Sequence, residues 1–167
     1  APIFSIYRGM NENGRAQTVV NTSFTMVCAC GIVLMTIGLV FARPLLVLFG
    51  ASESALVYAY PYMMIYLIGT VPSMLTIGMN PFINAQGYAT TGMISVMIGA
   101  AANLILDPLF IFAFHLGIEG AAIATVISQI MSACFVIIFL RRKAEYKIRL
   151  LHREKLGECT EYEKNIV

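Results

Sequence analysis

The fold is decided by the stretch MISVMIGAAANLILDPLFIFAF, residues 93–114, in which Asp107 is the one charged residue. As a helix it is long enough to cross about 30 Å of hydrocarbon, which takes about 20 residues. Between Ser54 and Arg141 the other acidic or basic residues are His115 and Glu119. A carboxylate at mid-bilayer costs about 2.5–3.5 kcal/mol, and such a group usually binds an ion, a proton or a cationic partner. We therefore expect a membrane protein with a cation site at Asp107.

The composition supports a membrane protein. Charged residues make up 12% of the chain, whereas a soluble domain carries about 25%. Apolar stretches predict an all-α membrane protein with four transmembrane helices, at about residues 19–41, 55–83, 93–114 and 121–140. Pro61, Pro72 and Pro81 predict that the second helix is kinked or tilted.

Basic residues predict the orientation. Of the 11 Lys and Arg residues, all but Arg43 lie before the first span or after the last. The positive-inside rule then places both termini in the cytoplasm of a multi-pass protein of the cell membrane. Residues 1–18 become a cytoplasmic segment, and residues 141–167 a basic cytoplasmic linker or tail. Apolar residues within that tail allow an amphipathic helix on the bilayer surface; the alternative is a topology anchor without a site.

The third span offers oxygen ligands for a cation. Asn103 and Asp107 are four residues apart and share one helical face. Pro108 has no N–H, so the carbonyl of Leu104 loses its usual partner. Carboxylate, amide and carbonyl oxygens suit Na⁺ or a shared proton, while sulfur and imidazole ligands for a transition metal are missing.

The fourth span is expected to complete this site. If the hairpin turns near Leu116, Asp107 matches Thr125 in depth, and Asn103 matches Gln129. The alternative is that the neutral groups only join the helices, at about 1 kcal/mol each, which does not explain an acid without a basic partner. Small residues that allow close helix packing lie on the same two spans: Gly99, Gly120, Ala124, Ser128 and Ser132.

Several motifs resemble the multidrug and toxic compound extrusion (MATE) transporters. They are Asn103-Leu-Ile-Leu-Asp107-Pro108, Gly117-Ile-Glu-Gly120-Ala-Ala-Ile-Ala-Thr125, Ser128-Gln129, Arg8-Gly9 with Gly14-Arg15-Ala16, Asn80-Pro81 and Gln86-Gly87. The resemblance implies twelve helices in two six-helix lobes that export organic cations or amphipathic drugs by alternating access, driven by Na⁺ or H⁺. It implies that Asn103, Asp107 and Thr125 hold the cation together with an acid on helix one. Tyr62 would lie near the cavity, or would be an ordinary interfacial aromatic.

The resemblance also implies missing parts. The four spans correspond to helices three to six of the N-terminal lobe, so helices one and two and the second lobe are expected as partners. The chain is then a fragment or truncated product, inactive alone, and its tail is the linker to the second lobe. A drug-like small molecule is the expected substrate, with no cofactor beyond the coupling ion and no nucleic-acid partner.

Other readings stay open. A related lipid or oligosaccharide flippase would share the four-helix pattern, and a structural membrane hairpin without transport activity is a further alternative. A channel subunit is disfavoured because no ring of charged groups or carbonyls is evident. An enzyme is not expected, because His115 and His152 lie outside the spans and no metalloprotease, P-loop or dinucleotide-binding motif is present.

Overall fold

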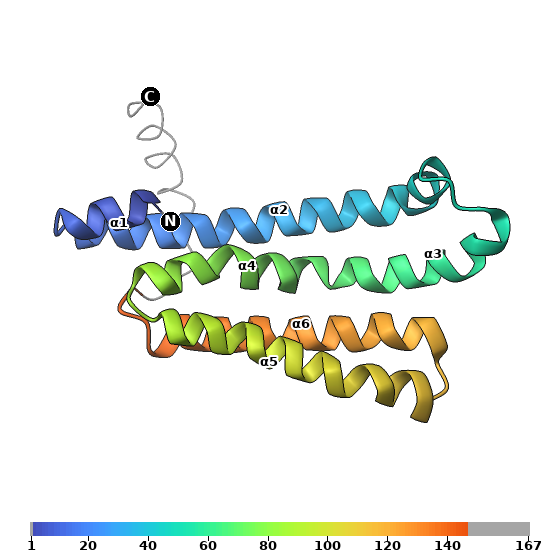
Figure 1. The fold of residues 1–167 in the computed structure, drawn as a ribbon. Helices are drawn as coiled ribbons and strands as arrows, with labels where there is room; N and C mark the ends of the chain where they lie inside the picture. The colour runs from blue at the N-terminus through green and yellow to red at the C-terminus, as the bar shows by residue number, and fades with distance from the viewer. Residues whose placement is uncertain (1, 147–167) are drawn as a thin grey trace.

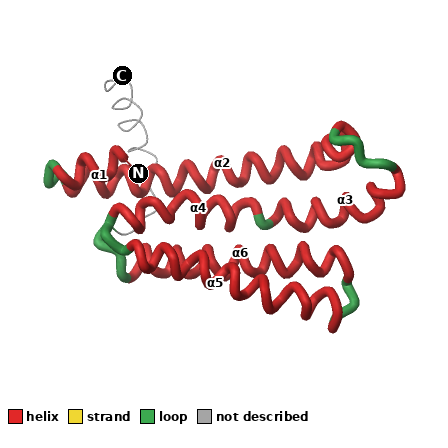
Figure 2. The backbone as a smooth tube through the Cα atoms, in the orientation of Figure 1, coloured by secondary structure: helices red, strands yellow, loops and turns green. Residues whose placement is uncertain are grey.

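The computed structural model describes residues 2–146, in which every regular element is a helix (Figures 1 and 2). The elements, in chain order, are α1 (Pro2–Gly9), α2 (Asn13–Leu48), α3 (Glu53–Ile68), α4 (Thr70–Ala85), α5 (Ala89–Pro108), the π-helical turn η1 (Leu109–Ala113) and α6 (Gly117–Arg142). The expected all-α class is confirmed. The amphipathic tail helix was expected largely after Tyr146 and so lies outside the described residues.

The helices form an elongated antiparallel bundle (Figure 1). α2 runs alongside the combined rod of α3 and α4, and α5 and α6 form a hairpin on the other side of that rod. Within that hairpin, α6 packs against α3 and α4 as well as against α5. Pro2 and Tyr146 lie at the same end of the bundle, here called the terminal end; the α5–α6 turn at Gly117 lies at the opposite end, here called the turn end.

The helix lengths agree with a membrane protein. Among the described residues, α2, α5 with η1, and α6 are each long and apolar enough to span a bilayer, and α3 with α4 makes a fourth span if the bent pair counts as one. α2 extends past both ends of the expected span 19–41. A helix continues into the polar region wherever its residues favour it, so these bounds do not mark the membrane surface, and the expected division into membrane and cytoplasmic segments stays a prediction.

The kink expected in the second span is present at one proline of the three. α3 and α4 meet at Gly69 with a bend of 46°. Pro72 explains the position, since it cannot donate to the carbonyl of Ile68 and its ring crowds that carbonyl. Pro61 and Pro81 lie inside continuous helices.

The main buried cluster lies at the terminal end, among α1, α2, α4, α6 and the residues just after α6. Its members are Phe4, Ala16, Val20, Met79, Phe82, Ile83, Val136, Phe139, Leu140, Ala144 and Tyr146. By contrast, α5 buries Gly92 and Ser95, and α3 has no fully buried residue. The bundle is therefore closely packed at one end and open along α3 and α5.

Directional contacts close the terminal end. We call them the terminal clasp, formed by Arg8, Asn13, Gln86, Glu145 and Tyr146. The Tyr146 N–H donates to Gln86 Oε1 at 3.1 Å, and the Tyr146 hydroxyl donates to Asn13 Oδ1 at 2.6 Å. Arg8 pairs with Glu145 at 3.0 Å and donates to the last carbonyl of α4 at 2.7 Å. The chain leaving α6 is thus tied to α1, α2 and the end of α4.

Candidate cation site

Asp107 and Asn103 lie in the last turns of α5, directly before the π-helical turn. Both side chains are half-buried, and Asn103 Nδ2 donates to Asp107 Oδ1 at 3.0 Å. Their four-residue spacing puts them one above the other on the helix, as the sequence predicted. Pro108 ends the regular helix, and π-helical turns often occur beside functional residues.

Thr125 of α6 joins this pair from the neighbouring helix. The same Asn103 Nδ2 donates to Thr125 Oγ1 at 3.3 Å. The Thr125 hydroxyl donates its own hydrogen to the Ala121 carbonyl at 2.9 Å, so its oxygen is left to accept from Asn103. One amide group therefore connects a carboxylate on α5 with a hydroxyl on α6, and the structure brings all three predicted residues together.

Asp107 has no basic partner in the described part of the chain. The two ion pairs found there are Arg8–Glu145 and Arg15–Glu12, and neither involves Asp107. Residues 2–146 also hold no group of three or more His, Cys, Asp or Glu side chains close enough to share a metal ion. One carboxylate with neutral oxygens around it fits a proton or a monovalent hard cation better than a divalent metal centre.

Gln129 does not form the pair with Asn103 that depth matching predicted. Its Oε1 faces Gly69, where a Cβ atom would collide with it, and is buried without a hydrogen-bond partner. Counting residues from the turn near Leu116 gives the depth of a residue on α6. It does not give the direction in which its side chain points around the helix. Because α6 has neighbours on several sides, a long side chain one turn beyond Thr125 reaches the bend between α3 and α4 instead.

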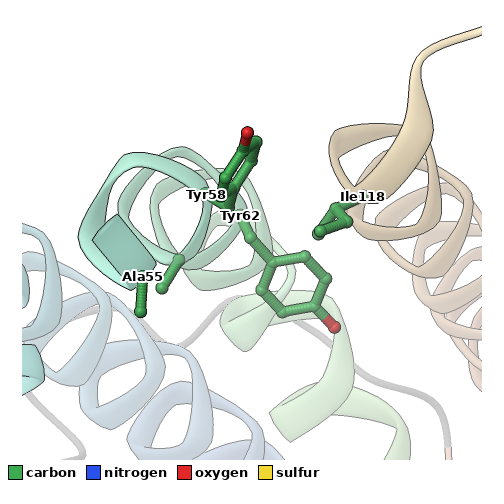
Figure 3. Close-up of a pocket in the computed structure, with 5 residues that line it drawn as sticks. Ala55, Tyr58, Tyr62 and Ile118 are labelled. Carbon is green, nitrogen blue, oxygen red and sulfur yellow. The ribbon is translucent and has the colours of Figure 1, made fainter. Parts of the chain in front are cut away.

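Leu104 and Tyr62 were the weaker candidates. The Leu104 side chain is exposed, and the role expected for its carbonyl stays a prediction. Tyr62 stacks on Tyr66 and lines an apolar pocket of about 430 Å³ with residues of α3 and with Ile118 of α6. Figure 3 shows the Tyr62 ring lying between α3 and Ile118. Tyr62 makes no hydrogen bond to Asn103, Asp107 or Thr125. It belongs instead to the lining of this apolar pocket at the turn end, here called the Tyr62 wall.

Sequence reasoning missed a second polar cluster, closer to the terminal end. Asn80 Nδ2 donates to the Gly92 carbonyl at 3.2 Å and approaches Ser95 Oγ at 3.4 Å. The Ser132 hydroxyl donates to the Ser95 carbonyl at 2.6 Å. This cluster joins α4, α5 and α6 on the terminal-end side of the Asp107 site. Ser132 was identified only as a small packing residue, and the spacing gives no signal that it bonds across helices.

The sequence comparison decides the family. A family profile described as MatE matches residues 1–109. The chain belongs to the MatE family. Relatives include the multidrug export protein MepA of Staphylococcus aureus strain bovine RF122 / ET3-1, which is 26% identical over 155 residues, 90% of this chain and 34% of the relative. MepA of Staphylococcus haemolyticus is 33% identical over 115 residues, 69% of this chain and 25% of the relative.

Solved MATE structures share the fold. A crystal structure of MATE in the bent conformation superposes with a TM-score of 0.85 at 25% identity, covering 93% of this chain and 36% of the other. An inward-facing multidrug resistance MATE transporter has a TM-score of 0.83 at 24% identity and covers 95% and 37% of the two chains. The chain thus spans about a third of the length of its MATE relatives, as part of one lobe, and it belongs to a family of transporters rather than enzymes.

Proposed function

We propose that this chain supplies the coupling-cation site of a multidrug exporter, with Na⁺ or H⁺ held by Asp107, Asn103 and Thr125. The exporter would exchange that cation for an amphipathic drug or organic cation by alternating access. The observation that carries the proposal is the single Asn103 amide that bridges an acid without a basic partner and a hydroxyl on the next helix. The full transport activity belongs to the whole protein, including parts beyond this chain.

Charge energetics favour a site that fills and empties. An ionised carboxylate at mid-membrane costs about 2.5–3.5 kcal/mol, and a bound proton or Na⁺ removes most of that cost. The occupied and empty forms of Asp107 therefore differ in energy by enough to change which conformation of a transporter is preferred. A permanent Lys or Arg partner would remove this difference, and no such partner lies within ion-pair distance among residues 2–146.

The Asn103 amide provides a simple two-state response. In the present arrangement its NH₂ group donates to Asp107 and to Thr125, which suits a carboxylate without a cation. Binding Na⁺ would require the amide to turn so that Oδ1 faces the ion, because only the oxygen can be a ligand. A protonated Asp107 would donate its own hydrogen to that oxygen. Either cation thus replaces the same two hydrogen bonds.

The positions of the basic residues support the proposal that both ends of the chain face the same side of the membrane. Arg8, Arg15 and the Arg141–Arg142 pair all lie towards the terminal end, whereas Arg43 lies at the far end of α2 (Figure 1). On the positive-inside rule the terminal end faces the cytoplasm. The Asp107 site then lies in the outer half of the bilayer, and the protein resides in the cell membrane. The proposed substrate class is supported by its relatives, which are named multidrug export proteins.

The test is an Asp107→Asn variant of the full-length protein in proteoliposomes. The amide keeps the size of the side chain but removes its charge, so membrane insertion stays intact and drug export no longer responds to a Na⁺ or pH gradient. Separate gradients of Na⁺ and of pH identify the coupling ion.

Glu119→Gln is the matched control. Glu119 is also an acid near the turn end, but it is exposed in the first turn of α6. Its variant should couple like the native protein. Native coupling in Asp107→Asn, with either ion, would refute the proposal.

A further inference from the structure

We propose that Gly120 is a positioning residue for the Asp107 site: its missing side chain sets the spacing between α6 and the turn that follows Asp107. The inference rests on the cation site proposed above. Gly120 is buried in the first turn of α6, a little more than one turn before Thr125. It has no polar group and touches no cation, so any effect it has must act through Asp107, Asn103 and Thr125.

Gly120 lies closest to backbone atoms of η1, and Leu116 Cβ is the next neighbour, 3.0 Å from the position of an added Cβ atom. A Cβ atom at this position would lie 2.8 Å from the Phe110 carbonyl oxygen and 2.9 Å from its carbonyl carbon. Phe110 lies in η1, directly after Asp107 and Pro108, and its carbonyl also accepts the Leu116 N–H at 3.3 Å. No change of rotamer relieves such a contact. An added methyl group would have to push η1 and α6 apart.

The required shift exceeds what the site tolerates. Two carbon atoms at optimal separation are at least about 3.5 Å apart. Relief of the 2.9 Å contact with the Phe110 carbonyl carbon would therefore separate the two elements by about 0.6 Å. The Asn103–Thr125 hydrogen bond is already 3.3 Å long. Such a bond is lost by about 3.6 Å, which leaves only about 0.3 Å of tolerance. The same separation would move the Thr125 oxygen away from those of Asn103 and Asp107, so the three groups could no longer reach one cation together.

Two other glycines provide graded controls for the same substitution. A Cβ atom at Gly99 would lie 3.3 Å from Ser132 Cβ, a side-chain contact between α5 and α6 towards the terminal end. At Gly14, in α2, nothing lies within 4 Å. The clash is therefore severe at Gly120, mild at Gly99 and absent at Gly14, while the chemical change is identical.

The experiment measures drug export by the full-length protein as a function of the coupling cation. For Gly120→Ala we expect the cation concentration at half-maximal export to rise about tenfold, within the range typical of changes to residues that orient ligands. The maximal rate at saturating cation and the drug KM should change by less than about twofold, because no drug or cation ligand is altered. Gly99→Ala should shift the half-maximal concentration by about twofold at most, and Gly14→Ala should leave it unchanged.

The outcomes separate this inference from the proposed function. Native coupling in Asp107→Asn would remove the site, and the role of Gly120 with it. Lost coupling in Asp107→Asn together with a native cation dependence in Gly120→Ala would refute the inference alone. Equal shifts in all three glycine variants would also refute it, since they would reflect helix propensity rather than spacing.

A second variant covers the case in which Gly120→Ala does not fold. Pro108→Ala restores an N–H that can bond the Leu104 carbonyl, which favours an ordinary α-helical turn in place of η1. Pro108 is exposed, so the change costs little packing. Phe110 would move relative to Gly120 without any added bulk. The half-maximal cation concentration should again rise about tenfold; a native value would overturn both the spacing role of Gly120 and the ligand role expected for the Leu104 carbonyl.

Discussion

The two ends of the bundle are built in different ways. At the terminal end, buried apolar side chains surround a clasp whose contacts join residues far apart in the chain, such as Arg8 with Glu145. At the turn end, the apolar side chains of α5 and η1 are largely exposed, and a single amide joins Asp107 to Thr125. The terminal end is therefore held by many contacts. The turn end is held mainly by the two hydrogen bonds of Asn103, which can exchange for a bound cation.

This difference separates stability from function. Substitutions at the terminal end should reduce the free energy of unfolding and leave cation dependence alone. Substitutions at the turn end should change the cation dependence and have little effect on the free energy of unfolding. Each prediction below concerns the full-length protein, with stability measured by reversible unfolding in mixed micelles and function by cation-dependent export in proteoliposomes.

The largest stability effect is expected for Phe4→Ala. Phe4 is 0% exposed and packs edge-on against Phe82 and Tyr146. Truncating a buried Phe typically costs about 3–5 kcal/mol. The matched control is Phe112→Ala in η1, whose side chain is 71% exposed, and which should change stability by about 0.5 kcal/mol or less. Equal losses in the two variants would show that the two ends are packed alike.

A smaller loss is expected for Tyr146→Phe, which removes only the hydroxyl that donates to Asn13. The ring stays in place, so the cost is that of one hydrogen bond, about 1 kcal/mol. Tyr58→Phe serves as the control, because Tyr58 is exposed and its hydroxyl has no bond to lose in the described structure. The cation concentration at half-maximal export should be native in both. A shifted cation dependence in Tyr146→Phe would show that the clasp and the cation site are coupled.

The smallest stability effect is expected for Thr125→Val. Hydrogen bonds between membrane helices contribute about 0.6 kcal/mol on average. Loss of the hydroxyl should nonetheless raise the half-maximal cation concentration at least tenfold, since a ligand is removed. Thr36→Val is the control, because Thr36 bonds only within its own helix, to the Ile32 carbonyl. A stability loss above about 2 kcal/mol with native cation dependence would assign Thr125 a structural role instead.

The helices and the grouping of Asn103, Asp107 and Thr125 could be predicted from the sequence because both depend on local rules. Apolar length fixes the spans, the four-residue spacing fixes one face, and a short turn fixes which residues of two antiparallel helices share a depth. The direction of Gln129 could not be predicted in this way. It depends on which of the helices around α6 comes closest, and that is a property of the whole bundle.

The terminal clasp was missed for a related reason. Its contacts join Arg8 with Glu145, Asn13 with Tyr146 and Gln86 with Tyr146. No periodic pattern relates residues so far apart in the chain, and the charged residues after α6 read as solvated or membrane-surface groups. The contact between Arg8 and Glu145 depends on the way in which α1 folds back beside α2, a turn that the sequence marks only weakly.

The bend at Gly69 divides one rod into two halves that are held in different ways. α4 is tied by Asn80 to α5, and Gln86, directly after α4, bonds Tyr146, whereas α3 packs against α2 and α6 without a fully buried side chain. With 16 residues rising about 1.5 Å each, α3 is a lever about 24 Å long. A tilt of about 5° at Gly69 would move its far tip by about 2 Å and carry the Tyr62 wall with it. A small rotation at one glycine would thus move side chains at the turn end while the terminal end keeps its contacts.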